Sequence, residues 1–131
     1  MKGLVIYTVQ DLDDRRGGVS IRVRILSESE PRTVNTKDGQ EHSVVDVMVG
    51  DRTGTVPLSL WDERIHDVDI GDIIDVDNAY VNTFKGRLRL NIGKYGKIEK
   101  VQDEGFPSTD ELSRLRRRRY RRRRTGYVGQ V

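Results

Sequence analysis

Hydrophobic and polar residues alternate along most of this chain with the two-residue period of a β-strand. The clearest case is Val-Ser-Ile-Arg-Val-Arg-Ile at 19–25, which places four aliphatic side chains on one face and a serine and two arginines on the other. By the same criterion we predict further strands at 43–49, 54–61, 73–83 and 87–92, with a last extended piece at 97–101. The pattern therefore predicts an all-β protein.

Turn signals and one short helical pattern separate the predicted strands. Lys37-Asp38-Gly39, residues 50–54 and Lys85-Gly86 have the composition of tight turns. Asp62 is a candidate N-cap for one or two helical turns at 63–68. Five strands with a short helix between the third and the fourth is the order of the oligonucleotide/oligosaccharide-binding (OB) fold, a five-stranded Greek-key barrel. A small SH3-like barrel is the alternative.

The fourth predicted strand changes phase along its length. Its apolar residues are even-numbered at Ile74 and Val76 but odd-numbered at Ala79 and Val81. One extra residue in a strand swaps the faces of all residues that follow, so a β-bulge near Asn78 reconciles the two phases. We therefore predict a bulge there, with the even-numbered residues beyond it on the outer face.

Aromatic and cationic side chains gather on that predicted outer face. Tyr80 and Phe84 lie on the fourth strand, and Arg87 and Arg89 lie on its hairpin partner. Trp61, the only tryptophan, ends the third strand on the face opposite its aliphatic residues. Aromatic rings for the bases, with cations nearby for the phosphates, are typical of proteins that bind single-stranded nucleic acids. Packing in the core or at the barrel rim is the alternative for each ring.

The formal net charge of +3 hides an uneven distribution. Residues 1–105 carry 15 Lys and Arg against 19 Asp and Glu, whereas residues 106–131 carry nine Arg against two acids. Runs of like charge repel one another and disfavour a packed structure. We therefore expect an OB domain at 1–105 and a flexible, disordered Arg-rich C-terminal tail at 106–131. On the acidic body, any site for a polyanion must be a local basic patch.

Several kinds of chemistry find no support in the sequence. The chain has no cysteine, its two histidines, His42 and His66, have no standard ligand spacing, and residues 50–54 lack the Lys-Ser/Thr ending of a phosphate-binding loop. No apolar run approaches the roughly 18 residues of a membrane span. We therefore expect a soluble intracellular protein that is not an enzyme, with no metal, no cofactor and no membrane partner.

Four runs carry a resemblance to a known family. They are Ser-Glu-Pro-Arg-Thr-Val-Asn-Thr-Lys-Asp-Gly at 29–39, Val-Gly-Asp-Arg-Thr-Gly at 49–54, Leu-Ser-Leu-Trp at 58–61 and Asn-Ala-Tyr-Val-Asn-Thr-Phe-Lys-Gly at 78–86. Over about residues 8 to 101 the chain resembles the simple single-stranded DNA-binding proteins of crenarchaeal type. These are similar to the human sensor-of-single-stranded-DNA proteins and to the domains of replication protein A.

The resemblance implies an OB fold in which three aromatic residues stack on successive bases, at the positions of Trp61, Tyr80 and Phe84. Tyr80 departs from the crenarchaeal pattern, which has tryptophan there, so its stacking area is smaller. The resemblance also implies a sequence-tolerant protein that coats single-stranded DNA in replication, recombination and repair, with replication and repair proteins as partners. Its expected place is the cytoplasm of an archaeal cell, with the nucleoid, and its expected state is a monomer.

The remaining predicted site residues are polar. The expected phosphate contacts are the cations Arg32, Lys37, Lys85, Arg87 and Arg89. The expected polar contacts to bases are Thr33, Asn35, Asn78, Asn82 and Asn91. In the tail, the expected contacts to a polyanion are Arg116, Arg117, Arg118, Arg119, Arg121, Arg122, Arg123 and Arg124.

Three alternatives stay open from the sequence. The first is an RNA-binding OB protein, because a stacking groove by itself does not distinguish ribose from deoxyribose. The second is a protein-interaction module that docks through its Arg-rich tail. The third concerns the tail alone, which lacks the acidic end frequent in the family and can fold back on the acidic body instead of binding nucleic acid.

Overall fold

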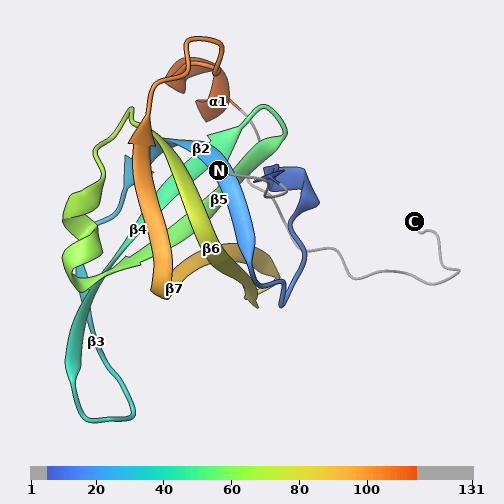
Figure 1. Cartoon of the computed structure of the whole chain (residues 1–131). Helices are drawn as coiled ribbons and strands as arrows, with labels where there is room; N and C mark the ends of the chain where they lie inside the picture. Colours follow the sequence, from blue (N-terminus) through green and yellow to red (C-terminus); the bar gives the residue numbers. More distant parts are fainter. Residues whose placement is uncertain (1–5, 115–131) are drawn as a thin grey trace, which may run out of the picture.

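The computed structural model describes residues 6–114; residues 1–5 and 115–131 lie outside the described part. Its elements appear in Figure 1. They are β1 (Ile6–Tyr7), the 3-10 helix η1 (Val9–Asp11), β2 (Val19–Glu28), β3 (Arg32–Asn35), β4 (Glu41–Asp51), β5 (Gly54–Trp61), the 3-10 helix η2 (Asp62–Asp67), β6 (Ile73–Phe84), β7 (Arg87–Val101) and α1 (Thr109–Ser113).

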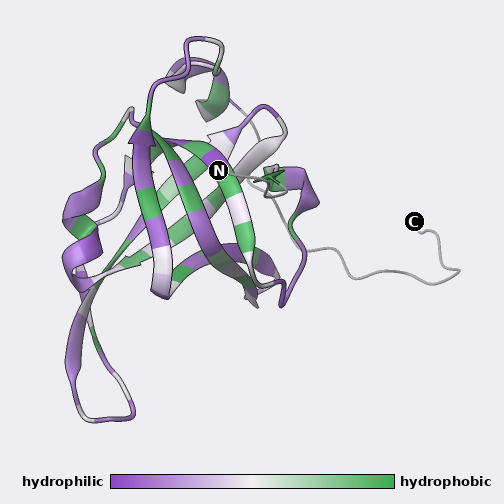
Figure 2. Cartoon of the chain, in the orientation of Figure 1, coloured by the Kyte–Doolittle hydropathy of each residue, from purple (hydrophilic) through white to green (hydrophobic). Residues whose placement is uncertain are grey.

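Five of the strands close into a barrel. Strand β2 pairs with both β4 and β6, β4 pairs with β5, β5 pairs with β7, and β7 pairs with β6. Only the β5–β7 pairing within this ring is parallel, as expected for a Greek-key OB barrel. The alternation of hydropathy along the barrel strands is visible in Figure 2. The predicted fold class is confirmed, and the core is aliphatic.

The bulge predicted in the fourth strand is present, and its counterpart on β7 is large. Asn78 has a positive φ of 58°. The β6–β7 ladder passes from the pair Asp77–Lys97 directly to the pair Ala79–Ile92, so one residue of β6 faces four residues of β7, Gly93 to Gly96. The two sequence pieces at 87–92 and 97–101 are therefore one strand, with residues 93–96 bulged out of the ladder.

The helix predicted after the third strand differs in type and in its cap. It is a 3-10 helix, and its N-cap is Trp61 rather than Asp62. Asp62 itself has a positive φ of 52°, and its carboxylate accepts hydrogen bonds from the backbone N–H of Ser43 and from the His42 ring. The acid is thus engaged by β4 and not by the first turn of η2, which the local sequence does not reveal.

The prediction that residues 106–131 form a flexible tail is wrong for its first nine residues. Ser108 and Glu111 form a capping box at the start of α1, and Leu112 is buried. The backbone carbonyl of Pro107 accepts a hydrogen bond from Arg24 of β2 at 2.8 Å. The packed body therefore extends to α1, which lies at the top of Figure 1, and Arg22 and Arg24 of β2 hold the segment before it through Asp103 and Pro107.

Candidate nucleic-acid interface

The outer faces of β6 and β7 carry the predicted aromatic and basic residues in a ladder. Past the bulge the cross-strand pairs are Tyr80–Asn91, Asn82–Arg89 and Phe84–Arg87. Tyr80 is 45% exposed and Phe84 is 57% exposed, so both rings lie at the surface as the alternation predicts. Hydrogen bonds among Asp46 of β4, Ser59 of β5 and Arg89 of β7, with the pair Asn82–Arg89, join this face of β6 and β7 to β5 and β4.

Trp61 and Tyr80 line the same cavity, of about 230 Å³, although they are distant in sequence. Arg64, Ile92, Gly93 and Lys94 complete its walls. Trp61 is partly exposed and is not part of the hydrophobic core cluster. The two rings and two cations therefore surround one concave surface, a combination that suits a nucleobase and its phosphate.

The Trp61 ring is held from one side by His42 of β4. The two rings meet edge to face, with centroids 5.8 Å apart and an interplanar angle of 69°. His42 Nδ1 lies 2.7 Å from Asp62 Oδ2. This hydrogen bond, with that from the Ser43 N–H, lowers the pKa of the Asp62 carboxyl. Trp61 therefore has a fixed neighbour that the sequence analysis did not identify.

Phe84 lies at the opposite end of the ladder, beside the turn Lys85-Gly86. Both turn residues have positive φ, as a two-residue hairpin turn requires. The Lys85 ammonium lies 5.3 Å from the Phe84 ring centroid, and the Arg89 guanidinium carbon lies 5.9 Å from it. Two cations thus lie beside an exposed ring, where a stacked base would bring its phosphates.

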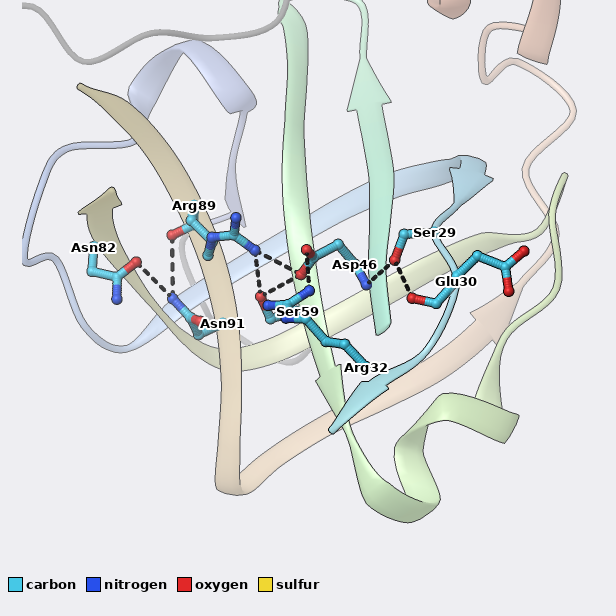
Figure 3. Close-up of polar contacts among 8 residues, drawn as sticks. All are labelled: Ser29, Glu30, Arg32, Asp46, Ser59, Asn82, Arg89 and Asn91. Atoms are coloured by element: carbon cyan, nitrogen blue, oxygen red, sulfur yellow. Dashed lines mark hydrogen bonds and ion pairs between the residues drawn. The ribbon is translucent and has the colours of Figure 1, made fainter. Parts of the chain in front are cut away.

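Asp46 occupies the centre of the surface and binds two arginines (Figure 3). Its Oδ2 accepts from Arg32 at 2.7 Å, and its Oδ1 accepts from Arg89 at 2.6 Å. The Ser59 hydroxyl also donates to Oδ1, at 3.0 Å. Burial raises the pKa of this carboxyl, but the arginines and the serine outweigh burial, so the pKa lies below its usual value.

These hydrogen bonds affect the exposure of two residues predicted to contact phosphates, Arg89 and Arg32. The side chain of Arg89 is only 18% exposed, and its Nη1 is shared between Asp46 and Ser59. Arg32 is 51% exposed, so its guanidinium reaches solvent beside the ion pair. Ser29 fixes the backbone of Asp46, because its N–H donates to the Asp46 carbonyl and its hydroxyl accepts from the Asp46 N–H.

The other predicted polar residues divide by exposure. Asn91 is 6% exposed and donates to Asn82 Oδ1 and to the carbonyl of Arg89, so it is a structural link between strands and not an open side chain. Arg87 is partly exposed. The exposed members are Thr33, Asn35, Lys37, Asn78, Asn82 and Lys85. Thr33, Asn35 and Lys37 belong to the β3–β4 hairpin, which extends away from the barrel in Figure 1.

The tail arginines Arg116 to Arg124 lie outside the described residues. Sequence reasoning missed His42, Asp46, Ser59, Arg64 and Lys94, which the fold brings to this surface. For Lys94 a signal existed, since Gly-Lys-Tyr-Gly interrupts an otherwise regular alternation at 93–96. Within residues 6–114 we find neither a cluster of His, Cys, Asp or Glu able to hold a metal ion nor a helix of the length and apolarity that crossing a membrane requires.

Comparison with known proteins identifies relatives of this chain. The family model for "Single-stranded DNA binding protein Ssb-like, OB fold" matches residues 16–100. The single-stranded DNA binding protein Ssb of Saccharolobus solfataricus is 34% identical over 104 residues, which cover 79% of this chain and 70% of that protein. Replication factor A of Methanothermobacter thermautotrophicus is 33% identical over 116 residues, but the match covers only 14% of that longer protein.

Solved structures support the fold. The replication factor A related protein from Methanobacterium thermoautotrophicum superposes with a TM-score of 0.65 at 23% identity, covering 78% of this chain and 96% of that one. Fission yeast Pot1, solved with single-stranded DNA, gives a TM-score of 0.60 at 14% identity, covering 84% of this chain and 43% of that one. Together with the family model and the Saccharolobus relative, the barrel shows that this chain belongs to the Ssb-like OB-fold family of single-stranded DNA-binding proteins.

Proposed function

We propose that this protein binds single-stranded DNA with little sequence preference and coats exposed strands during replication, recombination and repair. Bases stack on Trp61, Tyr80 and Phe84, and cations along both sides of these rings contact the phosphates. Membership of the Ssb-like family supports the ligand class, since the Saccharolobus relative is named a single-stranded DNA binding protein. No step of this function requires a catalytic group.

The observation that carries the proposal is the shared cavity of Trp61 and Tyr80. Two aromatic rings from β5 and β6 meet there beside Arg64 and Lys94, and neither ring belongs to the core cluster. Every base has a face that can stack, and each stacked base contributes about 1–3 kcal/mol whatever its identity. A surface built in this way recognises exposed bases and not a particular sequence.

The shape of the surface favours single strands over duplex. Reading a duplex requires side chains that reach base edges from within a groove, usually from a helix or a narrow ribbon. Here the rings lie on a sheet and around a cavity, and a paired base cannot stack on them without leaving the helix. The open Arg32 and Lys85 side chains then contact the backbone of the single strand.

Fluorescence of Trp61 tests the proposal, because it is the only tryptophan. The full chain is titrated with oligo-dT, with oligo-rU and with a duplex of equal length at fixed salt. We expect strong saturable quenching with dT and little with duplex. Equal quenching by rU and dT assigns the site to single-stranded nucleic acids in general, and absence of quenching with every oligonucleotide contradicts the stacking model.

A further inference from the structure

Tyr95 is the most exposed large hydrophobic side chain among residues 6–114. It is 76% exposed, more than Phe84 at 57% or Tyr80 at 45%. A single exposed ring is common on protein surfaces, so what Tyr95 can bind depends on the residues beside it. Tyr95 lies in the four-residue bulge of β7, which the sequence analysis treated as a gap between strands.

The bulge is rigidly attached to the rest of the fold. Nη2 of Arg64, from η2, donates to the carbonyl of Gly96 at 2.6 Å and approaches that of Gly93 at 3.4 Å, so one guanidinium joins both ends. A Cβ on Gly96 would lie 2.4 Å from Cγ1 of Ile92, so the backbone at Gly96 packs tightly against the base of the bulge. The Tyr95 ring is therefore presented from a braced segment.

The bulge places Tyr95 next to the cavity shared by Trp61 and Tyr80. Its neighbour Lys94 lines that cavity, and adjacent Cα atoms are about 3.8 Å apart. The Lys94 ammonium lies 5.7 Å from the Tyr95 ring centroid, so the ring contacts a residue of the cavity wall although it is not itself part of that wall. The pairing of an exposed ring with a lysine repeats that of Phe84 with Lys85.

Strand register orders the rings along the surface. Phe84 lies at the hairpin end of the β6–β7 ladder, and Tyr80 lies four residues before it in β6. Moving away from the hairpin, the bulge of β7 follows directly after the pair Tyr80–Asn91 and its neighbour Ala79–Ile92. Tyr95 is therefore at the end opposite to Phe84, with the Trp61–Tyr80 cavity between them. The rings would meet a strand of nucleic acid in that order.

We propose that Tyr95 is a fourth base-stacking residue, with Lys94 as its phosphate contact, and that the binding surface extends over the 93–96 bulge. The ligand is single-stranded nucleic acid, so this inference rests on the proposed function. Stacking on a side chain that is exposed in the free protein costs little reorganisation. It also lengthens the strand that one barrel engages beyond the three positions of Trp61, Tyr80 and Phe84.

The test compares Tyr95→Ala with Tyr95→Phe, which keeps the ring, and with Ile70→Ala, which removes an exposed apolar side chain from the loop before β6. Each variant is titrated through Trp61 fluorescence with oligo-dT of about 4 to 16 nucleotides, the range of site sizes for one OB fold. We expect Tyr95→Ala to weaken binding of the longer oligonucleotides by about five- to a hundredfold. Tyr95→Phe and Ile70→Ala should bind as the wild type does.

The outcomes separate this inference from the function on which it rests. If the wild type is quenched by oligo-dT but Tyr95→Ala binds equally well at every length, Tyr95 is not a stacking residue and the proposed function stands. If no oligonucleotide quenches the wild type, the proposed function fails instead. Weakening by Tyr95→Phe equal to that by Tyr95→Ala would assign the effect to the hydroxyl and overturn stacking.

Photocrosslinking gives a positional check. Oligo-dT with a single 5-iododeoxyuridine at successive positions is irradiated with the full chain, and the crosslinked peptides are mapped. We expect crosslinks to Tyr95 and to Phe84 from opposite ends of the oligonucleotide. Crosslinks to Phe84 and Trp61 with none to Tyr95 from any position would overturn the inference.

Discussion

Asp46 is an acid at the centre of a surface that we propose binds a polyanion. Its carboxylate faces the region where bases would lie and holds Arg32 and Arg89 by charged hydrogen bonds. A negative charge there repels a phosphate, so we expect uncharged bases, and not phosphates, to lie over Asp46. Arg89, only 18% exposed, is held inward by this contact, whereas Arg32, 51% exposed, still reaches solvent beside the ion pair.

Asp46→Asn should therefore make binding more dependent on salt. The substitution removes the central charge and its ion pair with Arg89, so that Arg89 can contact a phosphate. Each added phosphate contact steepens the slope of log K against log salt by about 0.7 for single strands. Trp61 titrations with oligo-dT at several salt concentrations measure the slope. Glu104→Gln, an equal charge change in the C-terminal segment, is the control. A slope identical to that of the wild type would show that Asp46 does not withhold Arg89 from phosphates.

The lowered pKa of Asp46 predicts a pH dependence of stability. An acid whose pKa is lower in the folded state than its ordinary 3.8 stabilises the fold above that value, and the contribution is lost as pH falls through the folded-state pKa. The difference in unfolding free energy between wild type and Asp46→Asn should thus be constant near neutral pH and shrink below about pH 4. Chemical unfolding across that range measures it. A difference that persists unchanged at low pH would contradict the assignment.

At the scale of elements, the paired bulges of β6 and β7 shape the interface. Asn78 adopts positive φ, which asparagine tolerates better than most residues, and the four-residue counterpart carries Lys94 and Tyr95 outward. The change of apolar phase around Asn78 predicted the bulge in β6. The length of the β7 bulge was not predictable, because it depends on where β7 resumes its pairing with β6, at Asp77–Lys97, and no local pattern shows that.

Gly96→Ala should destabilise the protein by about 1–3 kcal/mol, a typical cost of overpacking. The added Cβ would lie 2.4 Å from Ile92 Cγ1 and 3.2 Å from the carbonyl oxygen of Asn78, so both strands must shift. Gly93→Ala is the matched control, since its Cβ would meet only Tyr80, at an ordinary 3.6 Å. Thermal or urea unfolding distinguishes them. Equal stabilities for the two variants would show that the bulge is not tightly packed.

Alternation along single strands was enough to predict the outward rings, but not their partners. Tyr80 and Phe84 follow from a two-residue period once the bulge is included. Asp46 and Ser59 gain their roles from contacts across β4, β5 and β7, which no local pattern records. Helix α1 had a readable signal in Ser108 and Glu111, a capping box, that the neighbouring arginine run obscured.

At the scale of the whole molecule, charge is divided between the described body and the tail sequence. Residues 6–114 carry 15 Lys and Arg against 21 Asp and Glu, and residues 115–131 carry eight Arg and no acid. The body is therefore acidic, and its affinity for DNA depends on a local surface. The arginines of the tail would add a contact that is electrostatic and independent of sequence.

A truncation after Arg114 tests that contribution without removing α1. We expect weaker binding of oligo-dT and a shallower salt dependence than for the full chain, because fewer phosphates are neutralised. The maximal quenching of Trp61 should be unchanged, since stacking belongs to the barrel. An unchanged salt slope would assign the tail to protein partners, and tighter binding would indicate that the tail competes with DNA for the acidic body.

Nuclear magnetic resonance of the full chain with oligo-dT tests the central claim most directly. If bases stack on the rings, the aromatic protons of Trp61, Tyr80 and Phe84 shift upfield and give intermolecular nuclear Overhauser effects to thymine base protons. If those resonances are unchanged while signals of the 103–114 segment or the tail shift, DNA binds elsewhere and the stacking account is wrong.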